Sequence, residues 1–431
     1  MFEVSKEILD SHEALLEIVF EDEVVEEAKR QAAREIAREV EIPGFRKGRA
    51  PYAKVSQVVG EPAILQEAAE HLLNEHYAEF LEEADVSPYG AGEFVDMDTS
   101  PLTFRIKVPL EPTVDLGDYR DLREEWVPPT VSEEEVDQVL EQVREEHAVL
   151  EPVDRPAELG DEILVDVQAT VDGDVIVDEE DIEAVLSEER PFLSVEFVQA
   201  LIGISVDEER TFTATLPETI EEPSLRGVEA EFTVKTKQIY ERRLPELDDA
   251  LASTVGSFET LEELVEDIRE RILSSKREQA ETAYRSQLVD KLVEEAEIAY
   301  PPQIIEDTLD DMIEEARNRL RRQQGQMSLE DALRLEGRTV EQLREEMRPQ
   351  AERRVARSLV LHEFAEQEDI EVSDDEVVQE YSDLLDQMGL GGRMPEAEVD
   401  VDSKLGRDLQ SNVLGRKVMS RLARLGRGEL E

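Results

Sequence analysis

The stretch Gly44-Phe45-Arg46-Lys47-Gly48-Arg49-Ala50-Pro51 sets three cations and one aromatic side chain close together in a chain whose formal net charge is −61. Its glycines permit a tight turn that projects the neighbouring side chains outward. Arginine side chains fork onto phosphate oxygens, and the phenylalanine offers an apolar anchor. These residues predict a basic loop with an aromatic tip, which suits a surface made of RNA and protein. A solvated turn between two helices is the alternative for a short basic loop.

Both sides of this loop have helical periodicity. Apolar residues recur at helical spacing over residues 21–40, with basic residues between them. Pro51 opens a short second helix, and a longer helix is expected over residues 61–83. Alternating apolar and polar residues at 14–20 and 102–108 predict half-buried strands. The first domain is therefore expected to consist of strands packed against helices.

A linker and a strand-rich segment follow. Pro128-Pro129 marks the linker, and Ser132 with Glu135 forms a capping box for a helix that is expected to end near Leu150. Strand character then appears in three short stretches, at residues 163–167, 212–216 and 232–236. A small β-rich domain is expected here.

From Pro245 onward the pattern is almost entirely helical. Thr260 with Glu263 forms a second capping box, and Thr339 and Ser373 are expected to start later helices. The breaks between helices are expected at Pro301-Pro302, Gly325 and the glycine-rich residues 389–392. Because the apolar stripes on these helices are narrow, we expect an open helical arm with a concave face.

Length and composition limit the class of protein. The 431 residues fit two or three domains, and the 40% hydrophobic share is enough for globular cores. With 108 acidic against 47 basic side chains, the chain repels nucleic acid and anionic lipid except where bases cluster. The lack of cysteine excludes disulfides and thiolate sites. We see neither a signal sequence nor a membrane-spanning stretch, so a cytoplasmic location is expected.

The sequence offers no pattern typical of a catalytic or metal site. The five histidines are scattered, and His71 and His76 are five residues apart, so they do not share one helical face. Phosphate-binding glycine loops and dinucleotide fingerprints are missing, and the abundant carboxylates are expected to form solvated helix faces. We therefore expect neither a metal nor another cofactor.

The basic loop from Gly44 to Pro51 resembles the ribosome-binding signature of the trigger factor family, in which a GFRxGxxP-like tip joins two helices. The resemblance extends over nearly the whole chain, through Pro217-Glu218, Leu225-Arg226-Gly227 and residues 241–248. It implies an α+β multidomain fold. An N-terminal α+β domain would dock on the ribosome, a small β-rich domain would be similar to FKBP-type prolyl isomerases, and an elongated all-helical C-terminal domain would cradle substrates.

The resemblance also implies domain boundaries and site residues. The N-terminal domain would span residues 1–115, and residues 116–154 would form a linker and the first helix of the C-terminal domain. The FKBP-like domain would span 155–243, and the helical C-terminal domain 244–431. The ribosome-binding residues carried over from the signature are Gly44, Phe45, Arg46, Lys47, Gly48 and Arg49.

The central domain departs from the family's isomerase pattern. After the VDG turn at residues 171–173 the family's aromatic has become aliphatic, with Ile176 in this segment, and Ile220 stands where the family has a tyrosine. Phe197 and Phe232 remain as pocket aromatics, with core residues of a degenerate domain as the alternative. Isomerisation needs an apolar pocket that desolvates the prolyl amide against a barrier of about 18–20 kcal/mol. We therefore expect weak or absent prolyl isomerase activity.

The resemblance implies an ATP-independent chaperone on the ribosome near the nascent-chain exit tunnel, in contact with ribosomal protein and RNA. Apolar strips on the helical arms would hold unfolded nascent polypeptides weakly, so that clients can leave to fold or be exported. The alternatives are a free prolyl isomerase, a SurA-like chaperone that does not bind ribosomes, and an acidic helical scaffold. Membrane contact is not expected, and the sequence leaves open whether free chains form homodimers.

Overall fold

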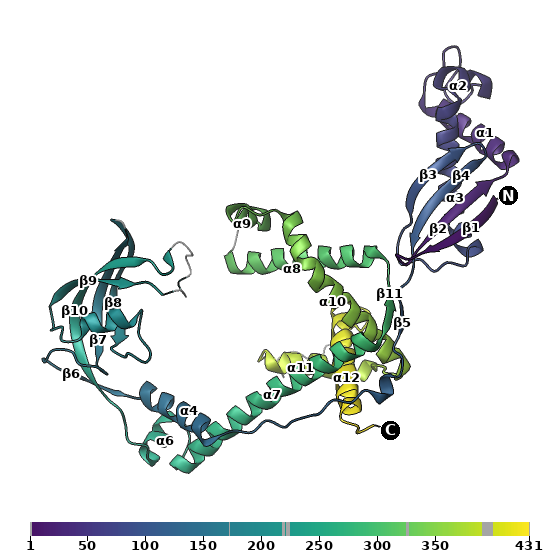
Figure 1. Cartoon of the computed structure of the whole chain (residues 1–431). Helices are drawn as coiled ribbons and strands as arrows, with labels where there is room; N and C mark the ends of the chain where they lie inside the picture. Colours follow the sequence, from purple (N-terminus) through teal and green to yellow (C-terminus); the bar gives the residue numbers. More distant parts are fainter. Residues whose placement is uncertain are drawn as a thin grey trace. The chain divides into compact units, whose positions relative to one another are not determined.

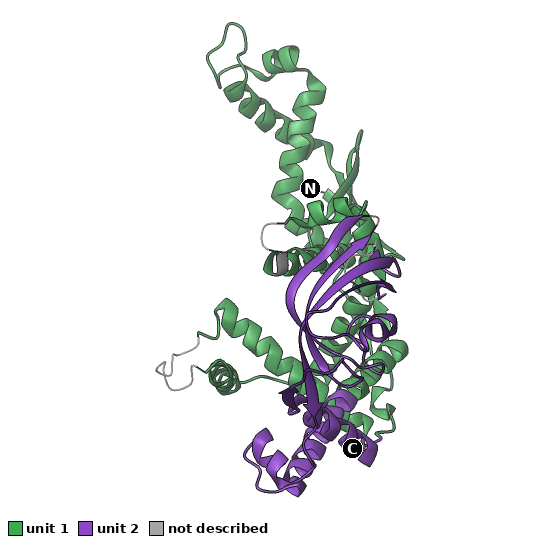
Figure 2. Ribbon diagram, turned by 90° about the vertical axis from the view of Figure 1, so that its left-hand side faces the viewer, with its two compact units in different colours: residues 1–126, 282–431 green, residues 127–281 purple. Residues whose placement is uncertain are grey.

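The computed structural model describes residues 2–171, 173–217, 220, 225–324, 327–389 and 400–430. The expectations at Asp172, Glu218, Gly325 and residues 390–392 fall outside these ranges. The chain forms two compact units (Figures 1 and 2). One contains residues 1–126 and 282–431, and the other contains residues 127–281. In the part of the chain that the structure describes, no helix has the length and apolar character needed to cross a membrane.

The N-terminal part of the first unit is an antiparallel sheet packed against helices. Its elements are β1 (Phe2–Leu9), β2 (Glu13–Phe20), α1 (Asp22–Glu39), α2 (Tyr52–Val59), α3 (Glu61–Glu83), β3 (Glu93–Thr99) and β4 (Leu102–Pro109). The strand order is β1-β2-β4-β3, and Leu16 of β2 lies opposite Ile106 of β4. Both side chains are buried in one cluster with Leu72 and Phe80 of α3. The sheet thus anchors the long helix α3.

The expected helices and central strands of this part are confirmed, but its outer strands were not expected. The strands β1 and β3 form the two edges of the sheet. Most side chains of β3 are exposed, and β1 has no fully buried residue among those described. An edge strand that buries few of its side chains fully lacks the strict alternation by which a half-buried strand is recognised.

The second unit contains an antiparallel sheet with one short helix packed in its core. Its elements are α4 (Glu133–Glu146), β6 (Val149–Pro152), β7 (Glu162–Val171), β8 (Asp174–Val185), α5 (Val195–Leu201), β9 (Glu209–Thr215), β10 (Glu229–Arg243), α6 (Asp249–Val255) and the first part of α7 (Leu261–Glu295). The long strand β10 pairs with β7, β9 and β6. Strands β7, β9 and β10 were expected, whereas β8 was not.

The helix α4 is shorter than the sequence indicated. The capping box of Ser132 and Glu135 is present, but the helix ends at Glu146 instead of near Leu150. Residues Val149–Pro152 pair with Tyr240–Arg243 of β10. The end of the stretch that was expected to be helical is therefore part of a strand. Apolar side chains of α4 pack with those of α6 and α7 in a separate cluster.

The C-terminal part of the first unit is mainly helical. Its elements are the end of α7, β11 (Glu297–Ala299), α8 (Pro302–Gln324), α9 (Leu329–Leu335), α10 (Val340–Gln367), α11 (Asp374–Gln387) and α12 (Lys404–Gly426). Thr339 and Ser373 are confirmed as N-caps with complete capping boxes. The region also holds a two-stranded sheet, in which β11 pairs with β5 (Thr113–Asp115). These strands are too short to give a sequence pattern.

A buried carboxylate joins three segments of this unit. The side chain of Glu368, at the end of α10, is only 3% exposed. It accepts hydrogen bonds from the Tyr119 hydroxyl at 2.9 Å, the Arg120 guanidinium at 3.1 Å and Arg421 Nε of α12 at 2.8 Å. Burial alone raises the pKa of Glu368, but the hydrogen bonds from Arg421 and Tyr119 and the charges of both arginines outweigh it, so the pKa lies below its usual value.

We predict that Glu368→Ala lowers the free energy of unfolding of this unit by about 1–3 kcal/mol, because it leaves the hydroxyl of the buried Tyr119 without its acceptor. The fluorescence of Trp126, the only tryptophan, reports the unfolding transition. Its ring packs against Tyr284, in the apolar cluster that also contains Tyr119. A carboxylate with a lowered folded-state pKa stabilises the fold above its unfolded-state pKa. The difference between wild type and variant should therefore shrink as the pH falls below about 4.3.

The matched control is Glu345→Ala, which removes the exposed carboxylate of the Glu345–Arg348 pair. An exposed pair of this kind contributes less than about 1 kcal/mol. Equal urea midpoints for the Glu368 and Glu345 variants would contradict the role of Glu368.

Candidate functional site

The basic loop between α1 and α2 consists of two consecutive β-turns. The Phe45 amide donates to the Ile42 carbonyl at 3.1 Å, and the Arg49 amide donates to the Arg46 carbonyl at 2.9 Å. The third residue of each turn is a glycine with positive φ, +85° at Gly44 and +74° at Gly48. A type II turn requires this conformation, which glycine adopts without strain. The turns aim the intervening side chains into solvent.

A small apolar core holds this loop in place. The loop residue Ile42 is buried together with alanines of α1 and with Val55 of α2 and Ile64 of α3. The Gly48 amide donates to the Ala37 carbonyl at 2.7 Å, which ties the second turn back to α1. Because alanine side chains are short, α1 and α3 can pack closely below the loop. The loop therefore rests on a packed helical base.

Two hydrogen bonds also link α2 to α3 at the base of the loop. The Tyr52 hydroxyl donates to Glu61 Oε2 at 2.7 Å, and the Ser56 hydroxyl donates to Glu61 Oε1 at 2.6 Å. Burial, together with the hydrogen bond to Glu61, raises the pKa of Tyr52 to about 12. The hydrogen bonds from Ser56 and Tyr52 lower the pKa of Glu61. The carboxylate of Glu61 is thus engaged locally with α2 instead of neutralising a cation of the loop.

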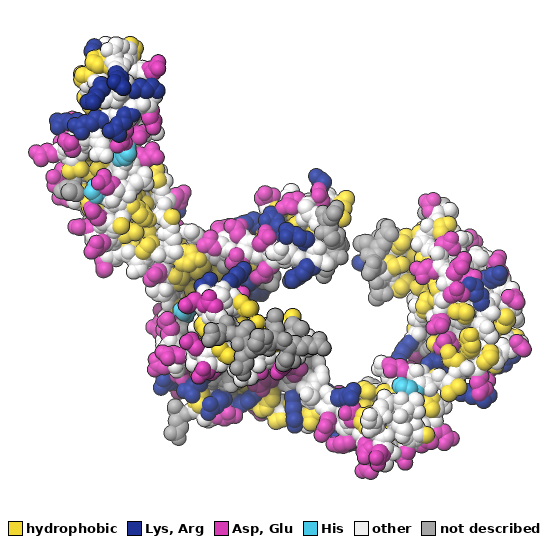
Figure 3. All heavy atoms as spheres, turned by 180° about the vertical axis from the view of Figure 1, so that it is seen from behind, with side chains coloured by type: hydrophobic (Ala, Val, Ile, Leu, Met, Phe, Trp, Pro, Cys, Tyr) yellow, Lys and Arg dark blue, Asp and Glu magenta, His cyan; other side chains and the backbone are white. Residues whose placement is uncertain are grey.

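The cations of the loop are available to a partner. Phe45 is 41% exposed, and Arg46, Lys47 and Arg49 are exposed beside it. Lys47 donates to the Glu39 backbone carbonyl at 3.4 Å. Within the described ranges, Arg46 and Arg49 form no ion pair, and the same holds for Arg34 and Arg38 of α1. Figure 3 shows Lys and Arg side chains gathered at this end of the N-terminal part. We name Phe45, Arg46, Lys47 and Arg49 the basic tip.

The residues expected to line an isomerase pocket lie together in the second unit. Phe197 of α5 and Phe232 of β10 are each 1% exposed, with ring centroids 5.3 Å apart. Ile176 and Ile220 are partly buried against the same cluster. Two further aromatic residues adjoin this cluster. The ring centroid of Phe212 of β9 lies 5.4 Å from that of Phe197, and the ring centroid of Phe192, which is 42% exposed, lies 6.0 Å from it. No motif in the sequence singles out these last two.

Exposed apolar side chains also occur on the C-terminal helices. On α11, Val378 is 47% exposed and Leu384 is 36% exposed, and Met388 directly after the helix is 63% exposed. Leu335 at the end of α9 is 79% exposed. We name Val378, Leu384 and Met388 the α11 apolar face. Apolar strips were expected on these helices, but the sequence alone did not identify their residues.

The N-terminal part has an apolar groove of its own. The groove has a volume of about 340 Å³ and lies between α3 and the edge of the sheet. Its walls are Ala69 and Leu73 of α3 and Phe94, Met97 and Phe104 of the strands. Phe94 is 49% exposed. Because α3 and these strands are distant in sequence, no sequence pattern could have shown the groove.

These surfaces define a class of protein more clearly than a reaction. A cationic tip attracts anionic surfaces, and exposed apolar side chains offer contacts to apolar partners. Together they are typical of a protein that binds macromolecular partners.

Comparison with known proteins identifies the family. The family model described as bacterial trigger factor protein matches residues 2–143, and the family model of the trigger factor C-terminus matches residues 260–423. The chain belongs to the trigger factor family, whose members are ribosome-binding chaperones. This family assignment confirms the prediction of a chaperone that was made from the sequence.

Individual relatives agree with this assignment. The trigger factor of Moorella thermoacetica is 36% identical over 375 residues, which cover 86% of this chain and 84% of the relative. That of Dehalococcoides mccartyi is 31% identical over 389 residues, covering 90% and 86%. A solved structure from work on promiscuous substrate recognition by the trigger factor chaperone aligns with a TM-score of 0.60 at 28% identity, covering 98% of this chain and 99% of the other.

Proposed function

We propose that the basic tip is the part of this chaperone that docks on the ribosome, at ribosomal protein and RNA near the nascent-chain exit tunnel. The observation that carries the proposal is a group of cations that form no ion pair with any described residue, in a chain of net charge −61. Phosphates attract such a group, while the acidic remainder of the chain is repelled. Gly44 and Gly48 supply the turn conformation, and Phe45 packs on an apolar part of the partner.

The remainder of the proposal follows the family. Residues 1–115 form the docking domain, residues 116–154 a linker with the first C-terminal helix, residues 155–243 an FKBP-like domain and residues 244–431 the domain that holds unfolded nascent polypeptides. The chaperone acts in the cytoplasm and needs no cofactor. It keeps new chains open so that they can fold or be exported.

We predict that the combined variant Phe45→Ala, Arg46→Ala, Lys47→Ala abolishes co-sedimentation with ribosomes at physiological salt. Two of the tip's cations and its apolar anchor are then missing, while none of the three side chains belongs to the buried core of the loop. The circular dichroism spectrum and the melting temperature should match those of the wild type.

The control for lost positive charge is Arg319→Ala with Arg321→Ala and Arg322→Ala. These arginines are exposed on α8 and, among the described residues, form no ion pair. They have no aromatic anchor beside them. The proposal is wrong if the tip variant still pellets with ribosomes, or if the α8 variant is lost from the pellet to the same extent.

For the client, we propose that the α11 apolar face is one of the surfaces that hold unfolded segments. Its three side chains are more than a third exposed, and an apolar side chain buried in a complex contributes on the order of 1 kcal/mol. Several such contacts bind an unfolded chain while each one is easily released. Release then needs no nucleotide hydrolysis.

The variant Val378→Ser, Leu384→Ser, Met388→Ser should suppress the aggregation of a denatured client less well, with an apparent affinity weakened by about tenfold or more. Ribosome co-sedimentation should not change. The control Asp386→Ser with Gln387→Ser alters exposed polar residues of the same helix. Suppression that equals the wild type's would remove the α11 apolar face from the proposal.

We further propose that prolyl isomerase activity is weak or absent. Phe197 and Phe232 are too deeply buried to offer a ring face to a substrate proline, and the more accessible Ile176 and Ile220 are aliphatic. Positions 176 and 220 therefore offer no flat ring that could pack on a proline, and the accessible ring beside them is that of Phe192. Both phenylalanines then support the wall of the site from behind.

Restoring aromatic side chains should raise the activity. We expect Ile176→Phe with Ile220→Tyr to accelerate proline-limited refolding of a model substrate at least tenfold over the wild type. Val175→Phe places a ring at a 55% exposed neighbouring position of β8 and should give no gain. A wild-type rate equal to that of an active family member would refute the proposal.

A further inference from the structure

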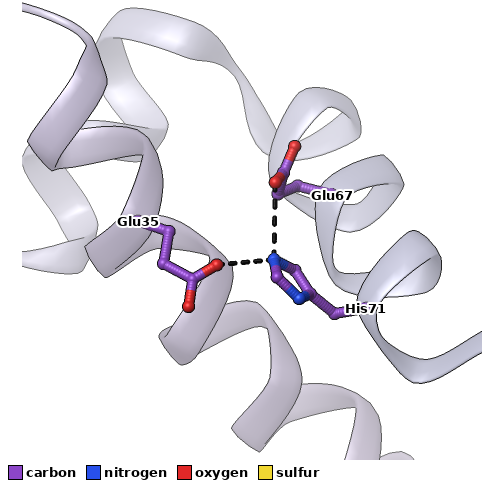
Figure 4. A group of neighbouring side chains, drawn as sticks. All are labelled: Glu35, Glu67 and His71. Atoms are coloured by element: carbon purple, nitrogen blue, oxygen red, sulfur yellow. Dashed lines mark ion pairs between the residues drawn. The ribbon is translucent and has the colours of Figure 1, made fainter. Parts of the chain in front are cut away.

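The two long helices below the basic tip bring together a histidine and two glutamates. Glu35 comes from α1, and Glu67 and His71 come from α3 (Figure 4). His71 Nε2 lies 2.5 Å from Glu35 Oε2 and 3.4 Å from Glu67 Oε1. The three groups each offer one ligand atom, and these atoms all lie within 4.8 Å of one another.

The fold explains why these side chains meet. Residues four apart on a helix share a face, which places Glu67 beside His71. Ala32 of α1 and Ala68 of α3 are fully buried in one small-residue cluster, so the two helices lie close together. Glu35 is one turn along α1 from Ala32 and therefore faces α3. Sequence spacing allowed His71 to be compared only with His76, because no pattern pairs α1 with α3.

From this geometry we propose that Glu35, Glu67 and His71 form a binding site for a divalent first-row transition metal, with Zn²⁺ as the best match. Imidazole nitrogen and carboxylate oxygen are ligands that Zn²⁺ takes, at about 2.0–2.2 Å in a tetrahedral arrangement. Neighbouring ligand atoms are then about 3.3–3.5 Å apart. The pair of Glu67 and His71, at 3.4 Å, already has this spacing.

The third ligand needs only a small adjustment. The Glu35 carboxylate has to move away from His71 by about 0.8 Å to reach tetrahedral spacing. The side chains of Glu35, Glu67 and His71 are 34%, 43% and 40% exposed, so they have room to move and the metal can enter from solvent. A water molecule completes the four ligands. The nitrogen ligand favours Zn²⁺ and its neighbours over Mg²⁺ and Ca²⁺, which prefer oxygen alone.

Two other histidines of the chain contact a carboxylate without forming such a group. His76 Nδ1 lies 2.8 Å from Glu79 Oε2, and His362 Nε2 lies 3.4 Å from Glu366 Oε1. Each of these contacts one carboxylate on its own helix. Across the residues that the structure describes, the His71 group is the one place where three such ligands converge. The competing explanation is that the imidazole N–H donates a hydrogen bond to the Glu35 carboxylate and links the helices without a metal.

Zinc binding to the full chain tests the site. After treatment with a chelator, the protein is titrated with Zn²⁺ in competition with a chromophoric chelator. We expect Glu35→Gln, Glu67→Gln and His71→Ala each to weaken Zn²⁺ binding by more than about tenfold. Zn²⁺ should also raise the melting temperature of the wild type but not that of Glu35→Gln, because a metal that bridges α1 and α3 binds only the folded state.

His362→Ala is the matched control, since His362 and Glu366 have the same spacing and the same 3.4 Å separation as His71 and Glu67. It should leave the affinity unchanged. The site is refuted if the wild type binds Zn²⁺ no better than His71→Ala, if His362→Ala weakens binding equally, or if Glu35→Gln has no effect. Should His71→Ala fail to fold, the partly exposed Glu67→Gln decides.

Discussion

Electrostatic repulsion between an acidic chain and a polyanionic partner is the constraint on which the rest of this structure depends. With 108 acidic and 47 basic side chains, the molecule can approach phosphate only where cations gather without carboxylates beside them. Many arginines are unavailable for this purpose, because carboxylates such as those of Glu306 and Glu315 hold them in ion pairs. Arg46 and Arg49 form no ion pair among the described residues, because turns carry them away from the acidic helices, and the proposed docking surface rests on this separation.

The rigidity of the tip comes from packing and not from charge. Ile42, the small core of alanines and the hydrogen bond from Gly48 to Ala37 fix the loop on α1 and α3. A preorganised loop loses little conformational entropy when it binds, so few contacts suffice for docking. The proposed metal site would clamp the same two helices further from the loop. Client binding has the opposite requirement, and in our proposal exposed side chains on α11 meet it without a shaped pocket.

Sequence patterns were the strongest guide where one physical rule governs a segment. The capping boxes at Ser132, Thr339 and Ser373 and the helix over residues 61–83 follow from local rules, and all are present. Edge strands and the short pairing of β5 with β11 were missed because solvent or a distant partner decides them. The basic loop could be recognised from the sequence alone, whereas the apolar groove and the His71 group form only when distant segments pack together.

The salt dependence of ribosome binding tests the central claim most directly. Each phosphate that a cation neutralises contributes about −0.7 to −0.9 to the slope of log affinity against log salt concentration. With Arg46, Lys47 and Arg49 in contact with RNA, the slope should be about −2 to −3, since only the tip contributes. An affinity that stays constant or rises with salt would show that the tip's charge does not drive docking, and would contradict the central role of electrostatic attraction between the tip and ribosomal phosphate.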